Sequence, residues 1–199
     1  MASRKTRHKA GVIGLGSMGL GVARTLLKKG FEVHAFDVRP EVLKAFAKEG
    51  GIAAKSPAEV GRHVPVVIVL VVNADQTSEV LFGKEGAVST LAKGAVVIAS
   101  STVAPEFAVE LGKRLAAKDL LLIDAPVSGG AARAAKGELS VMASGAKAAF
   151  KKADAVLKAI AIKVYELGDA PGTGSKVKMI NQLLAGVHIA AAAEAVALG

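Results

Sequence analysis

The sequence predicts an α/β fold with a doubly wound, mostly parallel sheet, and three observations lead to that prediction. A glycine-rich turn near the N-terminus joins an apolar strand to a helix. Apolar segments of strand length then alternate with helical segments along the chain, which is the pattern of repeated β-α-β units. Segments such as 64–72 carry no polar residue on either face, as strands do when helices cover both sides of a parallel sheet.

The first unit contains a dinucleotide-binding fingerprint. A strand runs into Gly14, Gly16 and Gly19 of a G-x-G-x-x-G turn, and a helix is expected to start near Ser17. In such a turn the first glycine takes the bend, the second lets the backbone approach a pyrophosphate, and the third lets the helix pack on the strand. The helix start then presents free N–H groups to phosphates. The motif alone also matches ordinary glycine-rich turns, so the strands around it carry the inference.

A second strand at 31–37 ends on Asp37, near the spacing of about 20 residues at which a carboxylate meets the adenosine ribose. Such a carboxylate accepts hydrogen bonds from ribose hydroxyls and repels a 2′-phosphate, which favours NAD. Arg39 favours NADP, because a guanidinium can hold that phosphate. We expect NAD as the cofactor, with NADP as the alternative. Asp37 as a solvated acid at a strand end is the competing interpretation.

The remaining elements follow in regular order. Pro40 and Pro105 open helices, Gly30 ends one, and Ser56 with Glu59 forms a capping box before a brief helix. The other predicted helices lie at 75–81 and 146–161. Further strands are predicted at 51–54, 64–72, 95–99, 120–123, 139–143 and 162–167. With the first two strands, this order is that of a Rossmann-type sheet.

The segment from Ser175 to the end is predicted to be one helix, apolar nearly all round between 183 and 198. Such a helix needs cover. The apolar part is short for a membrane span and carries His188 and Glu194, so we expect no membrane. We expect a basic leader at 1–8, a dinucleotide-binding domain at 9–168, and an interdomain helix at 169–199 that begins a truncated all-α domain or meets another subunit.

Composition excludes several classes of function. The chain of 199 residues has no cysteine, so it has no disulfide framework and no thiolate metal ligand, and we expect no metal. Its net charge is +9, and without the four cations of the first ten residues it is 9 − 4 = +5. There is no basic patch interleaved with aromatics, so we expect no nucleic acid and instead an anionic substrate. The leader lacks the apolar core of a secretory signal, and we expect a cytoplasmic protein.

Four segments, taken in order, resemble the β-hydroxyacid dehydrogenase family, which includes 3-hydroxyisobutyrate dehydrogenase and tartronate semialdehyde reductase-type enzymes. They are the turn at 14–19, Ser-Ser-Thr at 100–102, Asp-Ala-Pro-Val-Ser-Gly-Gly at 124–130, and the helix start at 172–181. Segments 71–74, 141–145 and 183–191 resemble the L-threonate dehydrogenase branch. Arg133 and Gln182 depart from the pattern, where many relatives have glycine and asparagine.

The resemblance implies roles for particular residues. Lys178 is expected to be the general acid/base, and Asn181 or Gln182 to hold the reacting oxygen or orient the lysine. Lys176 is expected at the surface. Three groups follow from the motifs: a substrate-carboxylate loop of Ser128, Gly129 and Gly130; Thr102 near nicotinamide and substrate; and cofactor contacts from Leu15, Ser17, Met18, Val72 and Asn73. Without the resemblance, 128–130 is an ordinary turn and Ser100, Ser101 and Thr102 cap the next helix.

The expected reaction is oxidation of a small hydroxy acid. Lys178 takes the hydroxyl proton, for which its pKa must lie below the usual value of about 10.4. L-threonate is the expected substrate, with 3-hydroxyisobutyrate or tartronate semialdehyde chemistry as the alternative. His34 and His188 are alternative bases. A non-catalytic NAD(P)-binding module, or an inactive fragment, is the alternative of another class. We expect a homo-oligomer formed through the C-terminal helix.

Overall fold

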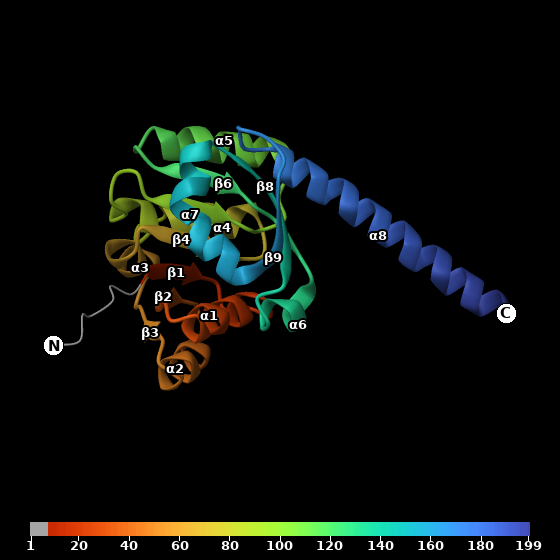
Figure 1. Cartoon of the computed structure of the whole chain (residues 1–199), viewed down its shortest axis with the longest axis horizontal. Coiled ribbons are helices and arrows are strands. Elements are labelled where there is room, and N and C mark those ends of the chain that lie inside the picture. The colour runs from red at the N-terminus through yellow and green to blue at the C-terminus, as the bar shows by residue number, and fades with distance from the viewer. Residues whose placement is uncertain (1–7) are drawn as a thin grey trace.

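The computed structural model describes residues 8–199. A twisted sheet forms the centre of the molecule, helices cover both of its faces, and one long helix projects from the body (Figure 1). Except for His8, the leader predicted at 1–8 lies outside the described residues. The predicted fold class is confirmed.

The sheet has nine strands in the order β3-β2-β1-β4-β5-β6-β8-β7, and β9 pairs with β8 off this path. The pairs from β3 through β6 are parallel, β8 is antiparallel to β6 and to β7, and β9 is parallel to β8. The strand bounds are β1 Lys9–Ile13, β2 Glu32–Phe36, β3 Ile52–Ala53, β4 Val66–Val69, β5 Val96–Ala99, β6 Leu121–Asp124, β7 Val127–Ser128, β8 Leu139–Gly145 and β9 Ala161–Glu166.

The chain order reverses at β1, which lies between β2 and β4. In open α/β sheets a crevice for ligands forms at such a point, outside the carboxyl ends of the strands. The helices are α1 Gly19–Lys28, α2 Pro40–Lys48, α3 Pro57–His63, α4 Ala74–Phe82, α5 Pro105–Ala116, α6 Gly130–Ala134, α7 Lys147–Ile160 and α8 Thr173–Leu198, with a 3₁₀ turn η1 at Ala87–Ser89.

Two apolar layers hold the sheet between the helices. Side chains of successive residues point to opposite faces of a strand. Accordingly Val12 and Ile68 belong to the layer that includes residues of α1 and α7, whereas Ile13 and Val67 belong to the layer that includes residues of α3, α4 and α5. This alternation explains why the central strands show no polar face in the sequence.

The strand predicted at 64–72 is shorter than expected. Only Val66–Val69 pairs with β1 and β5, and the ladder closes where the N–H of Leu70 donates to the carbonyl of Ile13 at 2.8 Å. Val72 is 78% exposed. The apolar run continues past the strand because its last residues line a pocket rather than the core, as described below.

Helix α1 begins at Gly19, two residues later than predicted, because Ser17 and Met18 still belong to the turn. The short elements β7, α6 and η1 were not predicted. They span two to five residues, which is too short for a periodic pattern to appear in a sequence.

Helix α8 is covered only at its start. Gly174, Ser175 and Lys178 are its buried residues, and its apolar side chains from Leu183 onward are exposed in this chain. Among the described residues, α8 is the one helix long and apolar enough to cross a membrane by length and composition, which is weak evidence for a span. Contacts within this chain do not cover the helix past Lys178, and its cover by a further domain or by another subunit stays a prediction.

Candidate active site

The turn after β1 has the geometry that its glycines predict. Gly14 has φ +92°, and a Cβ built on Gly19 would lie 1.9 Å from the carbonyl oxygen of Gly14. A Cβ built on Gly16 would meet no atom within 4 Å. Two glycines are thus required by the fold of the turn, whereas Gly16 borders open space in which a pyrophosphate fits. The residues present therefore fit a dinucleotide.

The helical ladder of α1 starts where the N–H of Leu20 donates to the carbonyl of Gly16 at 3.1 Å. The N–H groups of Ser17 and Met18 precede this bond, so they are the groups that a helix start leaves free for a phosphate. Leu15 differs from them. Its side chain lies in the core, and its N–H donates to Asp37.

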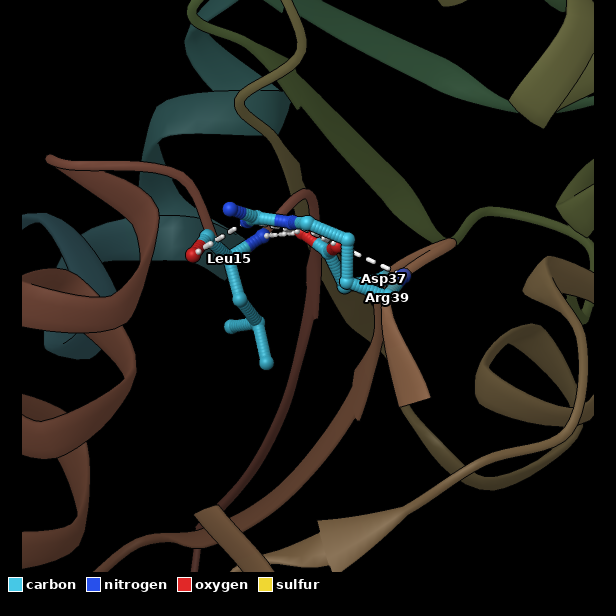
Figure 2. Close-up of polar contacts among 3 residues, drawn as sticks. All are labelled: Leu15, Asp37 and Arg39. Atoms are coloured by element: carbon cyan, nitrogen blue, oxygen red, sulfur yellow. Dashed lines mark hydrogen bonds and ion pairs between the residues drawn. The ribbon is translucent and has the colours of Figure 1, made fainter. Parts of the chain in front are cut away.

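Asp37, at the carboxyl end of β2, joins the turn to Arg39 (Figure 2). Its Oδ2 accepts the N–H of Leu15 at 2.7 Å and Nη2 of Arg39 at 3.0 Å. Its Oδ1 accepts the backbone N–H and Nε of Arg39 at 3.0 and 2.8 Å. Arg39 Nη2 also donates to the carbonyl of Leu15 at 3.1 Å. Asp37 is therefore a bonded group of the turn and not a free solvated acid.

Burial alone would raise the pKa of Asp37, which is 8% exposed, but the hydrogen bonds from Arg39 and Leu15 outweigh it and hold the pKa below its usual value. An ionised carboxylate offers about four acceptor positions, and four donors occupy those of Asp37 here. A ribose hydroxyl can therefore bond to Asp37 only where the Arg39 side chain withdraws.

A pocket of about 390 Å³ lies beside this group, at the carboxyl ends of β1, β2 and β4. It is mainly apolar and has Gln76 and Glu79 on the α4 side; its lining includes Gly14, Gly16, Asp37, Arg39, Val71, Val72 and Val80. Val72 thus faces the predicted cofactor site. Asn73 does not line the pocket: its Oδ1 accepts the N–H of Gln76 at 2.9 Å and caps α4.

The predicted catalytic lysine meets the predicted substrate loop. Lys178 is 6% exposed, and its Nζ donates to the hydroxyl of Ser128 at 2.9 Å. That hydroxyl in turn donates to Oδ1 of Asn181 at 3.3 Å. Burial lowers the pKa of Lys178 below the usual lysine value. The three residues come from β7 and from two successive turns of α8.

The loop after β7 leaves its backbone accessible. Gly129 and Gly130 have φ values of +133° and +68°, and a Cβ on Gly130 would meet no atom within 4 Å. Gly129 is the N-cap position of α6, where a helix leaves free N–H groups. A hydroxyl and unhindered backbone donors therefore lie beside Lys178, as a carboxylate nest requires. Arg133, the departure from the family pattern, is exposed on α6.

The polar residues after β5 do not cap a helix. The N-cap of α5 is Ala104, so the helix-cap interpretation of residues 100–102 is wrong. Ser101 Oγ donates to the carbonyl of Val71 at 2.8 Å and accepts from Thr77 at 3.2 Å, which joins β5 to the pocket wall. Ser100 Oγ is buried and has no partner among the described residues. Thr102, the next residue after these two buried serines, is exposed.

The other candidate residues lie apart from this cluster. Lys176 is exposed, as expected, and so are Gln182 and His188 on α8. His34 is buried in the middle of β2, where it contacts Glu32 at 2.9 Å and stacks on His63. In the part of the chain that the structure describes, no group of three or more His, Cys, Asp or Glu side chains forms a metal site.

Sequence reasoning missed the work of Asp124, at the end of β6. Its carboxylate, 1% exposed, accepts the N–H groups of Gly172 and Ser175 at the start of α8, both at 2.9 Å. An acid that directly follows a buried strand was the available signal. Its partners lie 48 and 51 residues away, so spacing did not reveal them.

Comparison with known proteins agrees with this geometry. Residues 9–168 match the family model described as the NAD binding domain of 6-phosphogluconate dehydrogenase. The L-threonate dehydrogenase of Cupriavidus necator is 64% identical over 189 residues, which are 95% of this chain and 64% of that protein. The chain thus spans less than two thirds of the length of this curated relative.

Solved structures share the fold of this chain. The crystal structure of 3-hydroxyisobutyrate dehydrogenase from Salmonella typhimurium has a TM-score of 0.91 and 47% identity, over 96% of this chain and 67% of that one. The structure of Psf3 in complex with NADP⁺ and 2-OPP has a TM-score of 0.90 and 28% identity, over 96% of this chain and 67% of that one.

Proposed function

Because the chain belongs to the β-hydroxyacid dehydrogenase family and carries its NAD(P)-binding domain, we propose that it takes part in oxidising a small hydroxy acid, with L-threonate as the substrate. The observation that carries the proposal is the buried amine of Lys178, 2.9 Å from the hydroxyl of Ser128. The relative that is 64% identical is named for L-threonate, which supports this substrate.

Lys178 acts as the general base. A protonated ammonium cannot take a proton, so a base with an ordinary lysine pKa of about 10.4 would be mostly inactive near neutral pH. Burial disfavours the charged form and lowers the pKa of Lys178. The neutral amine then accepts the proton of the substrate hydroxyl, while Asn181 holds the hydroxyl of Ser128 and the reacting oxygen in register.

The substrate carboxylate binds at Ser128, Gly129 and Gly130. The free N–H groups of this loop donate to the carboxylate, and the Ser128 hydroxyl, which has one hydrogen to donate, turns from Asn181 to the carboxylate when the substrate binds. The glycines leave room for the ligand. Binding there brings the substrate hydroxyl toward Lys178. Thr102 lies after β5, at the same carboxyl edge of the sheet, and contacts substrate and nicotinamide there.

The dinucleotide binds over Gly14, Gly16 and Gly19, with its phosphates at the start of α1 and its adenosine in the pocket beside Asp37. When bound, its nicotinamide supplies the hydride acceptor. We prefer NAD, because Asp37 is ionised where a 2′-phosphate would lie. Calorimetric affinities for NAD and NADP decide the preference, and tighter NADP binding would reverse it.

Replacement of Lys178 tests the proposed role in a full-length protein. The Lys178→Met variant keeps the length and apolar stem of the side chain but removes the amine. We expect NADH formation from L-threonate to fall by about 10²- to 10⁴-fold, the usual contribution of a general base. NAD affinity, measured by calorimetry, should stay unchanged because the adenosine pocket lies at β1, β2 and β4.

Lys176→Met is the matched control, since Lys176 is exposed two residues away on the same helix. It should leave turnover unchanged. Near-normal turnover by Lys178→Met would rule out the mechanism. Failure of the wild-type protein to bind NAD or NADP in calorimetry would rule out the dehydrogenase proposal altogether.

A second activity is favoured by the solved structure named 3-hydroxyisobutyrate dehydrogenase, which is 47% identical. The same site suits that substrate, because it also has a carboxylate and a nearby hydroxyl. Assays of NADH formation with a panel of hydroxy acids separate the two. Substrate-independent NAD binding without turnover on any member of the panel would identify a binding module instead.

A further inference from the structure

We propose that Asp124 is a positioning residue: through the start of α8 it holds Lys178 against Ser128. The inference rests on the proposed function for its kinetic consequence, because Lys178 is the base there. The structural part stands on contacts that none of the candidate roles above uses.

The carboxylate of Asp124 collects donors from the first turn of α8. Oδ2 accepts the N–H groups of Gly172 and Ser175 at 2.9 Å each, and Oδ1 accepts the hydroxyl of Ser175 at 2.6 Å. Gly172 occupies the N-cap position and has no side chain with which to cap the helix. A residue of β6 therefore performs the capping function that the helix sequence lacks.

Ser144 of β8 completes this arrangement. Its hydroxyl accepts the N–H of Gly174 at 3.0 Å and donates to Oδ2 of Asp124 at 3.3 Å. We call Asp124, Ser144 and Ser175 the α8 anchor. All three are buried, so their hydrogen bonds are shielded from competition with water.

The helix also approaches the strands closely at this point. A Cβ on Gly174 would lie 2.5 Å from the carbonyl oxygen of Met142 and 2.6 Å from that of Asp124. The backbone of α8 therefore rests directly on β6 and β8. Such contact leaves little freedom for the first turn to shift while the anchor is intact.

The anchor determines the place of Lys178 by helix geometry. Ser175 and Lys178 are three residues apart, so they share one face of α8. Past Lys178, the side chains of the helix are exposed in this chain. The direction of α8, and with it the depth of the lysine amine, is thus set by the first turn and by the Ser128 contacts.

The charge of Asp124 is balanced by the helix rather than by the lysine. The positive end of a helix dipole lies at its N-terminus, where the carboxylate is bound. Burial is the cause that lowers the pKa of Lys178, and its amine forms no ion pair among the described residues. The anchor can therefore fix the lysine without stabilising its charged form.

The test compares Asp124→Ala with Asp124→Asn. The alanine variant removes both oxygen acceptors of the carboxylate. The first turn of α8 should then become more mobile, and the Lys178 side chain more exposed to solvent. The asparagine variant keeps one oxygen for the N–H groups of Gly172 and Ser175, and its amide can donate to the Ser175 hydroxyl. It should therefore restore most of the lost function.

Two readouts are measured on each variant. Acetylation of Lys178 by acetic anhydride, followed by peptide mass spectrometry across pH, gives the pH of half-maximal reactivity without substrate or cofactor. In Asp124→Ala we expect this pH to rise. We expect kcat for L-threonate with NAD to fall by about 10- to 100-fold, because a small displacement of a reacting group lowers the rate by about that factor. KM and the affinity for NAD should change less.

Asp154→Ala is the matched control, because Asp154 is an exposed carboxylate of α7 that pairs with Lys158. It should leave both readouts unchanged. Where Asp124→Ala does not fold, Ser175→Ala should move both readouts in the same direction by less. A Lys178 acetylation profile identical to wild type in every folded anchor variant would overturn the proposal.

The two proposals fail differently. If wild type oxidises no hydroxy acid but the acetylation profile still shifts in Asp124→Ala, the proposed function fails and the positioning of Lys178 stands. If wild type turns over L-threonate and the profile does not shift, the positioning role fails and the proposed function stands.

Discussion

At the scale of single residues, the proposed site for the adenosine ribose depends on Asp37 and Arg39. The Arg39 side chain bonds to each oxygen of Asp37 once, through Nε and Nη2. These are two acceptor positions, the number that the two ribose hydroxyls of NAD would need. The same guanidinium, swung outward, is the group that would pair with a 2′-phosphate. In the proposed site, the Arg39 side chain would thus compete with the ribose of NAD and attract the 2′-phosphate of NADP.

Removal of this side chain should separate the two cofactors. In Arg39→Ala we expect NAD to bind more tightly by a few-fold and NADP more weakly by about tenfold or more, since a hydrogen bond to a charged group is worth about 1.5–3 kcal/mol. Titration calorimetry with each dinucleotide measures both. Arg24→Ala is the control, because Arg24 also pairs with a carboxylate, Glu49, away from the pocket. Equal losses for NAD and NADP would contradict this account.

At the scale of elements, Gly16 and Gly19 have different roles in the turn between β1 and α1. A Cβ on Gly19 would overlap the carbonyl oxygen of Gly14, whereas a Cβ on Gly16 would enter open space. Stability and binding should therefore separate by position, in line with the different roles that the motif gives to its glycines.

Alanine at these two positions tests the division. Gly19→Ala should lower the free energy of unfolding by about 1–3 kcal/mol or more, because its methyl group meets backbone atoms that cannot move aside. Gly16→Ala should unfold like wild type in urea but bind NAD at least about tenfold more weakly, a cost of about 1.4 kcal/mol. A Gly16→Ala protein with normal NAD affinity would show that the pyrophosphate lies elsewhere.

Elements with a local signature were predictable from the sequence. Helix α2 begins at Pro40 and ends at Lys48 as predicted, and Ser56 caps α3 by accepting the N–H of Glu59 at 3.2 Å. Elements that depend on distant partners were not. Strand β7 has two residues and exists because Val127 and Ser128 pair with β8. No window of the sequence around 127 records that pairing.

The residues of the candidate site also divide into those that a local motif predicts and those whose roles depend on distant partners. Motif resemblance identified Ser128, Lys178 and Asn181, which the fold brings into hydrogen-bond contact across 50 to 53 residues. It did not reveal Asp124 as the cap of α8, nor that Asn73 caps α4. Both duties depend on which backbone groups lie opposite, and spacing along the chain does not contain that information.

At the scale of the whole molecule, the two halves of the site lie along one edge of the sheet. The pocket proposed for adenosine lies at the ends of β1, β2 and β4, and Ser128 follows the end of β6. Parallel strands carry their carboxyl ends to the same edge, so a dinucleotide laid along it extends from the first site toward the second. Helix α8 projects from the body of the molecule (Figure 1). Its buried residue Lys178 contacts Ser128 at this second site.

The central claim is that a buried, neutral Lys178 takes the substrate proton, and the pH dependence of kcat/KM for L-threonate oxidation tests it most directly. Burial lowers the pKa of Lys178, and the neutral form is the active one. Activity should therefore rise with pH through one ionisation that lies below the usual lysine pKa of about 10.4, and fall as pH drops beneath it. That ionisation should vanish from the residual activity of Lys178→Met and persist in Lys176→Met. A Lys178→Met profile that keeps the same ionisation would contradict the account.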